Sequence, residues 1–252
     1  SDQWAHDNTG QATSYSGGYV GTPDCDTDTD QAWDITTGSE ETIISIIDTG
    51  VNEHSELSGK IVGGFDFINN DYDAYDDNGH GTACAGIAAA IGNNGQGIAG
   101  VCWDCLVMPI KVLGADGYGD DNGISNGIIW STDNDADVIS MSLGGGGYAS
   151  YTDSAINYAT ENGTVVLSAS GNDNAGSVSY PSAYTNSISV GALSPCNERK
   201  STNSCDGENF WGSNYGTGLD FLAPGVRINT ITSSGGYTST FNGTSSACPH
   251  AA

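Results

Sequence analysis

The sequence predicts an α/β fold, with a mostly parallel central sheet, helices on both of its faces and a β-hairpin just before the last helix. The main observation is that short apolar runs rich in β-branched residues alternate with segments of helical character. The clearest of these runs is apolar on successive residues, which fits a strand buried on both faces. The chain has no internal repeat or linker, so we expect one domain over residues 1–252.

Strands are expected where an apolar run of four to eight residues ends in turn residues. The first is the run at residues 42–47, which ends in Asp48-Thr49-Gly50. The other expected strands cover residues 106–113, 136–143, 164–169, 187–192 and 219–223, with a hairpin over residues 226–241. Helices are expected at residues 31–35, in the Ala-rich segment that begins near His80, at residues 122–132 and 151–161, and after Ser245.

The charge composition excludes several classes of partner. Lys and Arg together number 5 and Asp and Glu 31, so the net charge is −26. Five cations cannot form the basic surface that nucleic acid or an anionic membrane requires, whereas bound cations are favoured. No apolar run approaches the ~20 residues of a membrane span. The first residues, Ser1 to Trp4, do not form a signal peptide, so we expect a mature chain of a secreted protein.

The seven cysteines favour an exported protein. Cys102 and Cys105 form a CxxC pair, and Cys196 and Cys205 bracket a short polar loop; both pairs predict local disulfides. A redox-active CxxC is the alternative for the first pair, and a zinc site is disfavoured because no second CxxC exists. Cys25, Cys84 and Cys248 remain, so at least one thiol is free or has its partner outside this chain.

Three residues lie where their side chains could do chemistry. Ser245 follows a glycine and a threonine at a helix start, where free N–H groups and the helix dipole favour developing negative charge. His80 lies between glycines at another helix start, and Asp48 ends a central strand, where open α/β sheets place function. Taken singly, His80 could be a structural histidine and Asp48 a turn cap. The glycine-rich loop at residues 93–100 offers carbonyl oxygens suited to a hard cation.

Together these stretches resemble the subtilisin family of serine proteases, the subtilases, from about Gln31 to the last residue. Asp48-Thr49-Gly50-Val51, His80-Gly81-Thr82 and Gly243-Thr244-Ser245-Ser246-Ala247-Cys248-Pro249-His250 are similar to its three signature segments, in the same chain order. Cys84 resembles the buried thiol of the proteinase K-like members. The resemblance implies that Ser245 is the nucleophile, His80 the general base and Asp48 its orienting acid, with Asn172 and the Ser245 N–H as oxyanion donors.

The resemblance also implies an extended substrate strand between two backbone segments. The implied cleft residues are Gly117, Tyr118, Gly119, Ser142, Leu143, Gly144, Gly145, Ala169, Ser170, Gly171 and Asn242. The glycines leave room for a large apolar side chain before the scissile bond (P1), so we expect broad specificity with such a preference. An Arg preference at P1 is the alternative in so acidic a protein.

Calcium is a further implication of the resemblance. The implied ligands are the side chains of Glu56 and Asn94 and the backbone oxygens of Gly92, Gln96 and Ile98, with Asp2 or Gln3 as an N-terminal ligand. The family continues beyond the serine-bearing helix, whereas this chain stops at Ala252, so the domain is expected to lack its C-terminal end.

The function expected from all of this is a secreted, calcium-stabilised serine endopeptidase. It would act on polypeptides, mature from a propeptide and be a monomer. A non-catalytic binding module is the second hypothesis, motivated only by the short C-terminus. An ester or carbohydrate hydrolase of the α/β-hydrolase type is disfavoured by the order Asp, His, Ser and by the absence of a Gly-x-Ser-x-Gly elbow.

Overall fold

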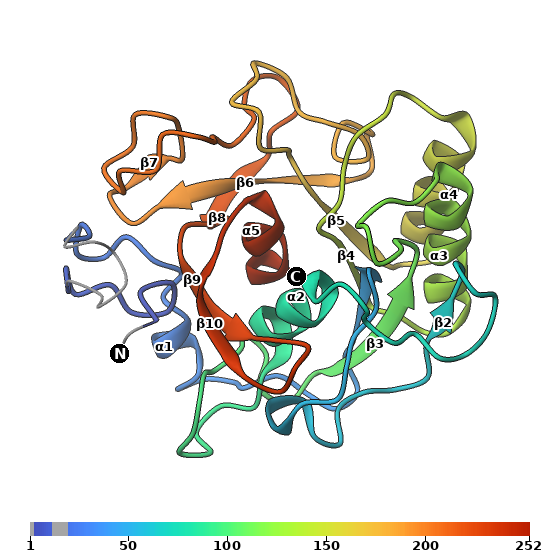
Figure 1. The fold of residues 1–252 in the computed structure, drawn as a ribbon, viewed down its shortest axis with the longest axis horizontal. Coiled ribbons are helices and arrows are strands. Elements are labelled where there is room, and N and C mark those ends of the chain that lie inside the picture. The colour runs from blue at the N-terminus through green and yellow to red at the C-terminus, as the bar shows by residue number, and fades with distance from the viewer. Residues whose placement is uncertain (1–2, 12–19) are drawn as a thin grey trace.

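A central eight-stranded sheet organises the computed structural model, which describes residues 3–11 and 20–252 (Figure 1). Its strands are β1 Ile43–Asp48, β2 Phe65–Asp66, β3 Leu106–Lys111, β4 Val138–Met141, β5 Val165–Ala169, β6 Ile188–Ser194, β7 Glu198–Arg199 and β8 Phe221–Pro224. They lie in the order β2-β3-β1-β4-β5-β6-β7, and β8 also pairs with β6. Every pairing is parallel except β6 with β7, which confirms the predicted α/β class.

Helices cover both faces of the sheet, as predicted (Figure 1). Helices α3 Asp121–Asp133 and α4 Ser150–Glu161 share one core with Ile47 of β1. On the opposite face lie α2 His80–Ala89 and α5 Thr244–Ala251, and the core beneath α2 contains Ile44 and Ile46. Strand β1 therefore buries alternate residues in two different cores, which explains why its sequence is apolar on successive positions.

The remaining elements are short. They are α1 Thr29–Ala32, a single 3-10 turn at Ser55–Leu57, and the antiparallel hairpin of β9 Ile228–Ile231 with β10 Tyr237–Phe241. The hairpin precedes α5, as the sequence predicts. The two-residue strands β2 and β7 and the 3-10 turn were not predicted, because elements this short carry no periodic signal.

A close backbone contact brings β1 and α2 together. A Cβ atom built on Gly81 would lie 2.2 Å from the carbonyl oxygen of Gly50, so no side chain fits at this position. The first turn of α2 can therefore rest on the turn that follows β1. This contact sets the spacing between Asp48, at the end of β1, and His80, at the start of α2.

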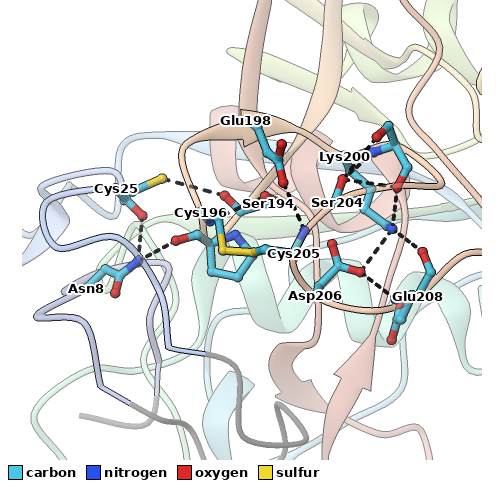
Figure 2. The surroundings of a disulfide bond; sticks show 12 residues. Asn8, Cys25, Ser194, Cys196, Glu198, Lys200, Ser204, Cys205, Asp206 and Glu208 are labelled. Carbon is cyan, nitrogen blue, oxygen red and sulfur yellow. Dashed lines mark hydrogen bonds and ion pairs between the residues drawn. A yellow bond between two sulfur atoms is a disulfide. The ribbon is translucent and has the colours of Figure 1, made fainter.

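Both predicted disulfides are present, and the second one closes a loop around a buried ion pair. Figure 2 shows the Cys196–Cys205 disulfide with Lys200 and Asp206 beside it. Lys200 is fully buried, and its Nζ lies 3.0 Å from Asp206 Oδ1. The other disulfide joins Cys102 to Cys105.

The three remaining cysteines are free and buried. Cys25 Sγ donates to the Ser194 carbonyl at 3.5 Å, so the N-terminal segment is held against the loop that carries Cys196 (Figure 2). Among the described residues, no helix combines the length and the apolar character that crossing a membrane requires.

Candidate active site

Asp48 and His80 form a hydrogen-bonded pair at the edge where β1 ends. The His80 Nδ1 lies 2.7 and 2.9 Å from the two carboxylate oxygens of Asp48. The Asp48 side chain is fully buried, whereas the side chain of His80 is 28% exposed. The carboxylate thus fixes the imidazole by Nδ1, which directs the other ring nitrogen, Nε2, away from Asp48.

This pairing changes the pKa of the imidazole. Burial alone would lower the pKa of His80, but the adjacent Asp48 carboxylate stabilises the imidazolium and raises the pKa well above its ordinary value of 6.5. Burial is the largest single effect on this pKa, but the charge of Asp48, its hydrogen bond to Nδ1 and the contact with Cys84 together outweigh it. His80 therefore binds a proton tightly for a histidine, as a general base that must hold one during catalysis requires.

A second buried carboxylate, Asp76, ties the two elements of this pair together. Its oxygens accept five hydrogen bonds, from Thr49 Oγ1, the Asn78, Gly79 and Thr82 backbone N–H groups and Thr82 Oγ1, at 2.6 to 3.1 Å. Thr49 belongs to the turn after β1, and Thr82 to the first turn of α2. Thr49 Oγ1 also accepts the backbone N–H of Gly81 at 2.9 Å. Asp76 thus links the residues next to Asp48 and His80 in the chain.

Ser245 lies in the first turn of α5, after Gly243, whose φ of 115° suits glycine. Its Oγ donates to the Ser142 carbonyl oxygen at 3.2 Å, and the described residues include no hydrogen bond between it and His80. Catalytic hydrogen bonds are often long or unmade without substrate.

The thiol of Cys84 contacts both of these residues, with Sγ 3.5 Å from the Ser245 carbonyl oxygen and 3.9 Å from His80 Nδ1. Burial raises the pKa of this thiol, which keeps it protonated.

Asn172 faces the start of α5 from the loop after β5. Its Oδ1 accepts the backbone N–H of Thr244 at 2.8 Å and Thr244 Oγ1 at 3.1 Å. Because these bonds use the oxygen, the amide NH2 is the end of the side chain that remains for a ligand. The arrangement places a hydrogen-bond donor beside Ser245.

These residues open on one cavity of about 950 Å³, lined by His80, Asn172 and Ser245 together. Nine of the implied cleft residues also line it: Gly117, Tyr118, Gly119, Ser142, Leu143, Gly144, Gly145, Ala169 and Gly171. The other two are not among its lining residues. Ser170 is fully buried, with its hydroxyl against Ser213 and Asn214. Asn242 directs its amide to Arg227 N at 2.6 Å and Glu208 Oε1 at 3.3 Å.

Several lining residues were not found by sequence reasoning. Ile124 and Tyr151 come from α3 and α4, and Tyr180 and Tyr184 from the loop between β5 and β6. The acidic residues Asp120, Asp121 and Asp173 line the cavity as well. The aromatic pair has a weak signal in its i, i+4 spacing, but nothing local in the sequence directs these side chains toward Ser245.

The implied calcium residues gather around Glu56. This side chain is fully buried, and its carboxylate accepts hydrogen bonds from Asn94 Nδ2 at 2.6 Å and the Tyr237 hydroxyl at 2.8 Å. Within the described part of the chain, no Lys, Arg or His pairs with it. The carbonyl oxygens of Gly92, Gln96 and Ile98 accept no hydrogen bond from the described residues. A buried negative charge without a cation and three unused carbonyls fit a hard cation such as Ca²⁺.

Two details qualify the ligand set. Asn94 directs its NH2 toward Glu56 and its Oδ1 to the backbone N–H of Gln96 at 3.1 Å, so a cation requires this amide to turn over. Gln3 lies at the end of the loop, with Oε1 accepting the Ala99 N–H at 2.8 Å. Asp2, the other implied N-terminal ligand, lies outside the described residues.

Comparison with known proteins gives a consistent result. The model of the subtilase family matches residues 39–252. Thermitase of Thermoactinomyces vulgaris is 44% identical over 223 residues, which cover 88% of this chain and 76% of thermitase. The thermophilic serine proteinase of Bacillus sp. strain AK1 is 42% identical over 226 residues, 89% of this chain and 53% of that protein.

A solved structure agrees with these sequence relatives. The crystal structure of a cold adapted subtilisin-like serine proteinase superposes with a TM-score of 0.70 at 34% identity, over 84% of this chain and 73% of that one. The chain spans about half the length of the AK1 proteinase and three quarters of thermitase. Its fold, its match to the family model over residues 39–252 and its identity to these relatives establish that the chain belongs to the subtilase family.

Proposed function

We propose that this protein is a secreted serine endopeptidase that cleaves polypeptides through the triad Asp48, His80 and Ser245. The observation that carries the proposal is the Asp48–His80 pair, 2.7 Å apart, whose imidazole lines the same cavity as Ser245. A non-catalytic module would have no need of a buried carboxylate paired to an exposed imidazole beside a serine. Family membership supports peptide bonds as the substrate.

The first chemical step requires one side-chain rotation. Ser245 Oγ turns from the Ser142 carbonyl to His80 Nε2, which accepts its proton as Oγ attacks the peptide carbonyl carbon. Asp48 stabilises the imidazolium through Nδ1, and His80 returns the proton to the leaving amine. The acyl-enzyme that remains on Ser245 is hydrolysed by water, which His80 activates in the same way.

The negative charge on the carbonyl oxygen is stabilised by two N–H donors. One is the Asn172 amide NH2, whose orientation is set by Thr244. The other is the backbone N–H of Ser245, which has no partner among the described residues because it lies in the first turn of α5. The positive end of the α5 dipole adds to the same field.

The substrate enters as an extended strand between residues 117–119 and residues 143–145, and main-chain hydrogen bonds hold it. Such binding tolerates many sequences. Ala169, Gly171 and Gly144 line the cavity with little bulk, which supports a large apolar P1 side chain. Maturation from a propeptide, a monomeric state and secretion belong to the same proposal, the last in keeping with two disulfides.

Calcium binding at the loop of residues 92–98 completes the proposal. Glu56 and Asn94 would supply side-chain oxygens, and Gly92, Gln96 and Ile98 backbone oxygens. A bound ion would neutralise Glu56 and tie this loop to the 3-10 turn at Ser55–Leu57, without taking part in the chemistry of the cleft.

A serine-directed fluorophosphonate tests the nucleophile directly. We expect a single covalent adduct, mapped to Ser245 by peptide digestion and mass spectrometry, because this residue lines the same cavity as His80 and Asn172. Ser246→Ala, which removes a neighbouring buried hydroxyl, should still be labelled, and Ser245→Ala should not. An adduct at another serine, or none on the folded protein, contradicts the proposed function.

Asn172→Ala should lower kcat by about 10²–10³-fold and leave KM nearly unchanged, because the lost donor acts on charge that exists only in the transition state. This magnitude is the one known for the equivalent donor of subtilisin, carried over here. Steady-state kinetics on a peptide amide gives both constants. Asn186→Ala, an exposed site bonded only to Asn157, serves as the control. A rise in KM with kcat unchanged would show that Asn172 binds the ground-state substrate instead.

The pH profile should report the raised pKa of His80. Only the neutral imidazole accepts the serine proton, and a raised pKa keeps His80 protonated at pH 6.5. The acid limb of kcat/KM should therefore lie above pH 6.5, and activity should rise toward alkaline pH. In Asp48→Asn the limb should move to lower pH and kcat should fall by about 10⁴-fold. An acid limb of kcat/KM at or below pH 6.5 in the unaltered protein would contradict a raised pKa of His80.

Calcium should stabilise the fold through Glu56. At a free calcium concentration about 100 times its Kd, the ion adds about 2.7 kcal/mol to the free energy of unfolding. Chelation should therefore lower the Tm measured by calorimetry. Glu56→Gln should remove most of this calcium dependence, whereas Glu53→Gln, an exposed neighbour, should retain it. Equal calcium dependence in both variants would place the ion elsewhere.

A further inference from the structure

The five cationic side chains of this protein are all engaged in internal contacts. Lys60, Lys111 and Lys200 are at most 6% exposed, and each ammonium group donates to backbone carbonyls. Arg227 pairs with Glu208 at 3.0 Å, and Arg199 stacks 4.3 Å above the Tyr215 ring. These are all the Lys and Arg residues of the chain. Of the three lysines, Lys111 reaches an exposed carboxylate, that of Asp77 at 2.7 Å. With five cations against 31 acidic residues, most surface carboxylates have no cationic side chain beside them.

The cleft itself shares this one-sided charge. Apart from His80, the fully charged side chains that line it are Asp120, Asp121 and Asp173. Asp173 follows Asn172 in the chain, and its carboxylate has no partner among the described residues. Asp120 uses Oδ1 to cap α3, accepting Gly123 N–H at 2.7 Å. Asp121 Oδ2 has only a long contact, 3.5 Å, to the Tyr151 hydroxyl.

Apolar and acidic side chains line the cavity together near Asp121, where the Tyr151 hydroxyl lies 3.5 Å from Asp121 Oδ2. Ile124 and Tyr151, from α3 and α4, line it together with Asp121. Lys and Arg have long aliphatic stems that cover apolar surface while the charged head reaches outward. A Glu side chain at this place would meet carboxylates with no cation to offset them.

We propose that the cleft selects polypeptides that carry Lys or Arg at the position seated against the start of α3, with Asp121 as the residue that determines this preference. The proposal rests on the endopeptidase function and names its substrate class. It differs from a basic preference at P1, because Asp121 begins α3, on one face of the sheet, whereas Ser245 lies in α5, on the opposite face.

The test uses internally quenched peptides with a fixed Phe at P1. Arg, Gln or Glu is placed in turn at each of four positions on either side of the scissile bond, and kcat/KM is measured at low salt. At one position, Arg should exceed Glu by roughly threefold to tenfold, the range of a solvent-exposed charge pair. The ratio should approach one in ~1 M salt, where the Debye length is about 3 Å.

Asp121→Asn should remove most of that ratio at the same position. Asp133→Asn is the matched control, because Asp133 is an exposed residue of the same helix with a similar tyrosine contact, to the Tyr158 hydroxyl at 2.6 Å, outside the cavity. Equal rates for Arg and Glu peptides, or equal effects of the two variants, would overturn the proposal while leaving the peptidase function intact. Failure to cleave any peptide, including those with Gln, would overturn the peptidase function itself.

Discussion

The candidate active site depends on one buried carboxylate that does not take part in the proposed chemistry. Asp76 joins Thr49 to the first turn of α2, and through them it sets how Asp48 meets His80. A strand end and a helix start have no covalent reason to stay within 2.7 Å of each other. Because the three hydrogen bonds that Asp76 accepts from Thr49 and Thr82 are buried, each would leave an unpaired group if the two elements separated. The hydrogen bonds to Asp76 thus fix the distance between Asp48 and His80, although Asp76 contacts neither side chain of the pair in the proposed chemistry.

Much of the fold could be predicted from the sequence. Strand β1 and its neighbours are buried on both faces, so their residues are apolar at successive positions and form continuous apolar runs. The triad candidates were also predictable, since glycine and small residues mark the places where backbone comes close, as at Gly81. The two-residue strands β2 and β7 could not be predicted, because pairing at this length is decided by the neighbouring strand. The direction of the Asn242 side chain could not be predicted either, because its amide is held by Glu208 and Arg227, which lie elsewhere in the chain.

The interior and the surface of this protein use charge in different ways. Inside, each lysine is surrounded by carbonyl oxygens or paired with an aspartate, as Lys200 is with Asp206 (Figure 2). Such ammonium groups satisfy backbone acceptors where loops cross and cannot take part in binding at the surface. Outside, the excess of carboxylates attracts cations, and Glu56 brings the same need for a cation into a buried loop. A single composition therefore accounts for both the expected calcium site and the acidity of the cleft.

The burial of Lys60, Lys111 and Lys200 has a consequence for the lifetime of the protein among its own copies. A protease at high concentration is its own most abundant polypeptide, and exposed loops are the first places it cuts. If the cleft favours cationic side chains, the folded surface presents almost none of them to a neighbouring molecule, and the dense negative charge keeps the molecules apart. The same distribution of charge that draws foreign substrates would protect the protein from autolysis.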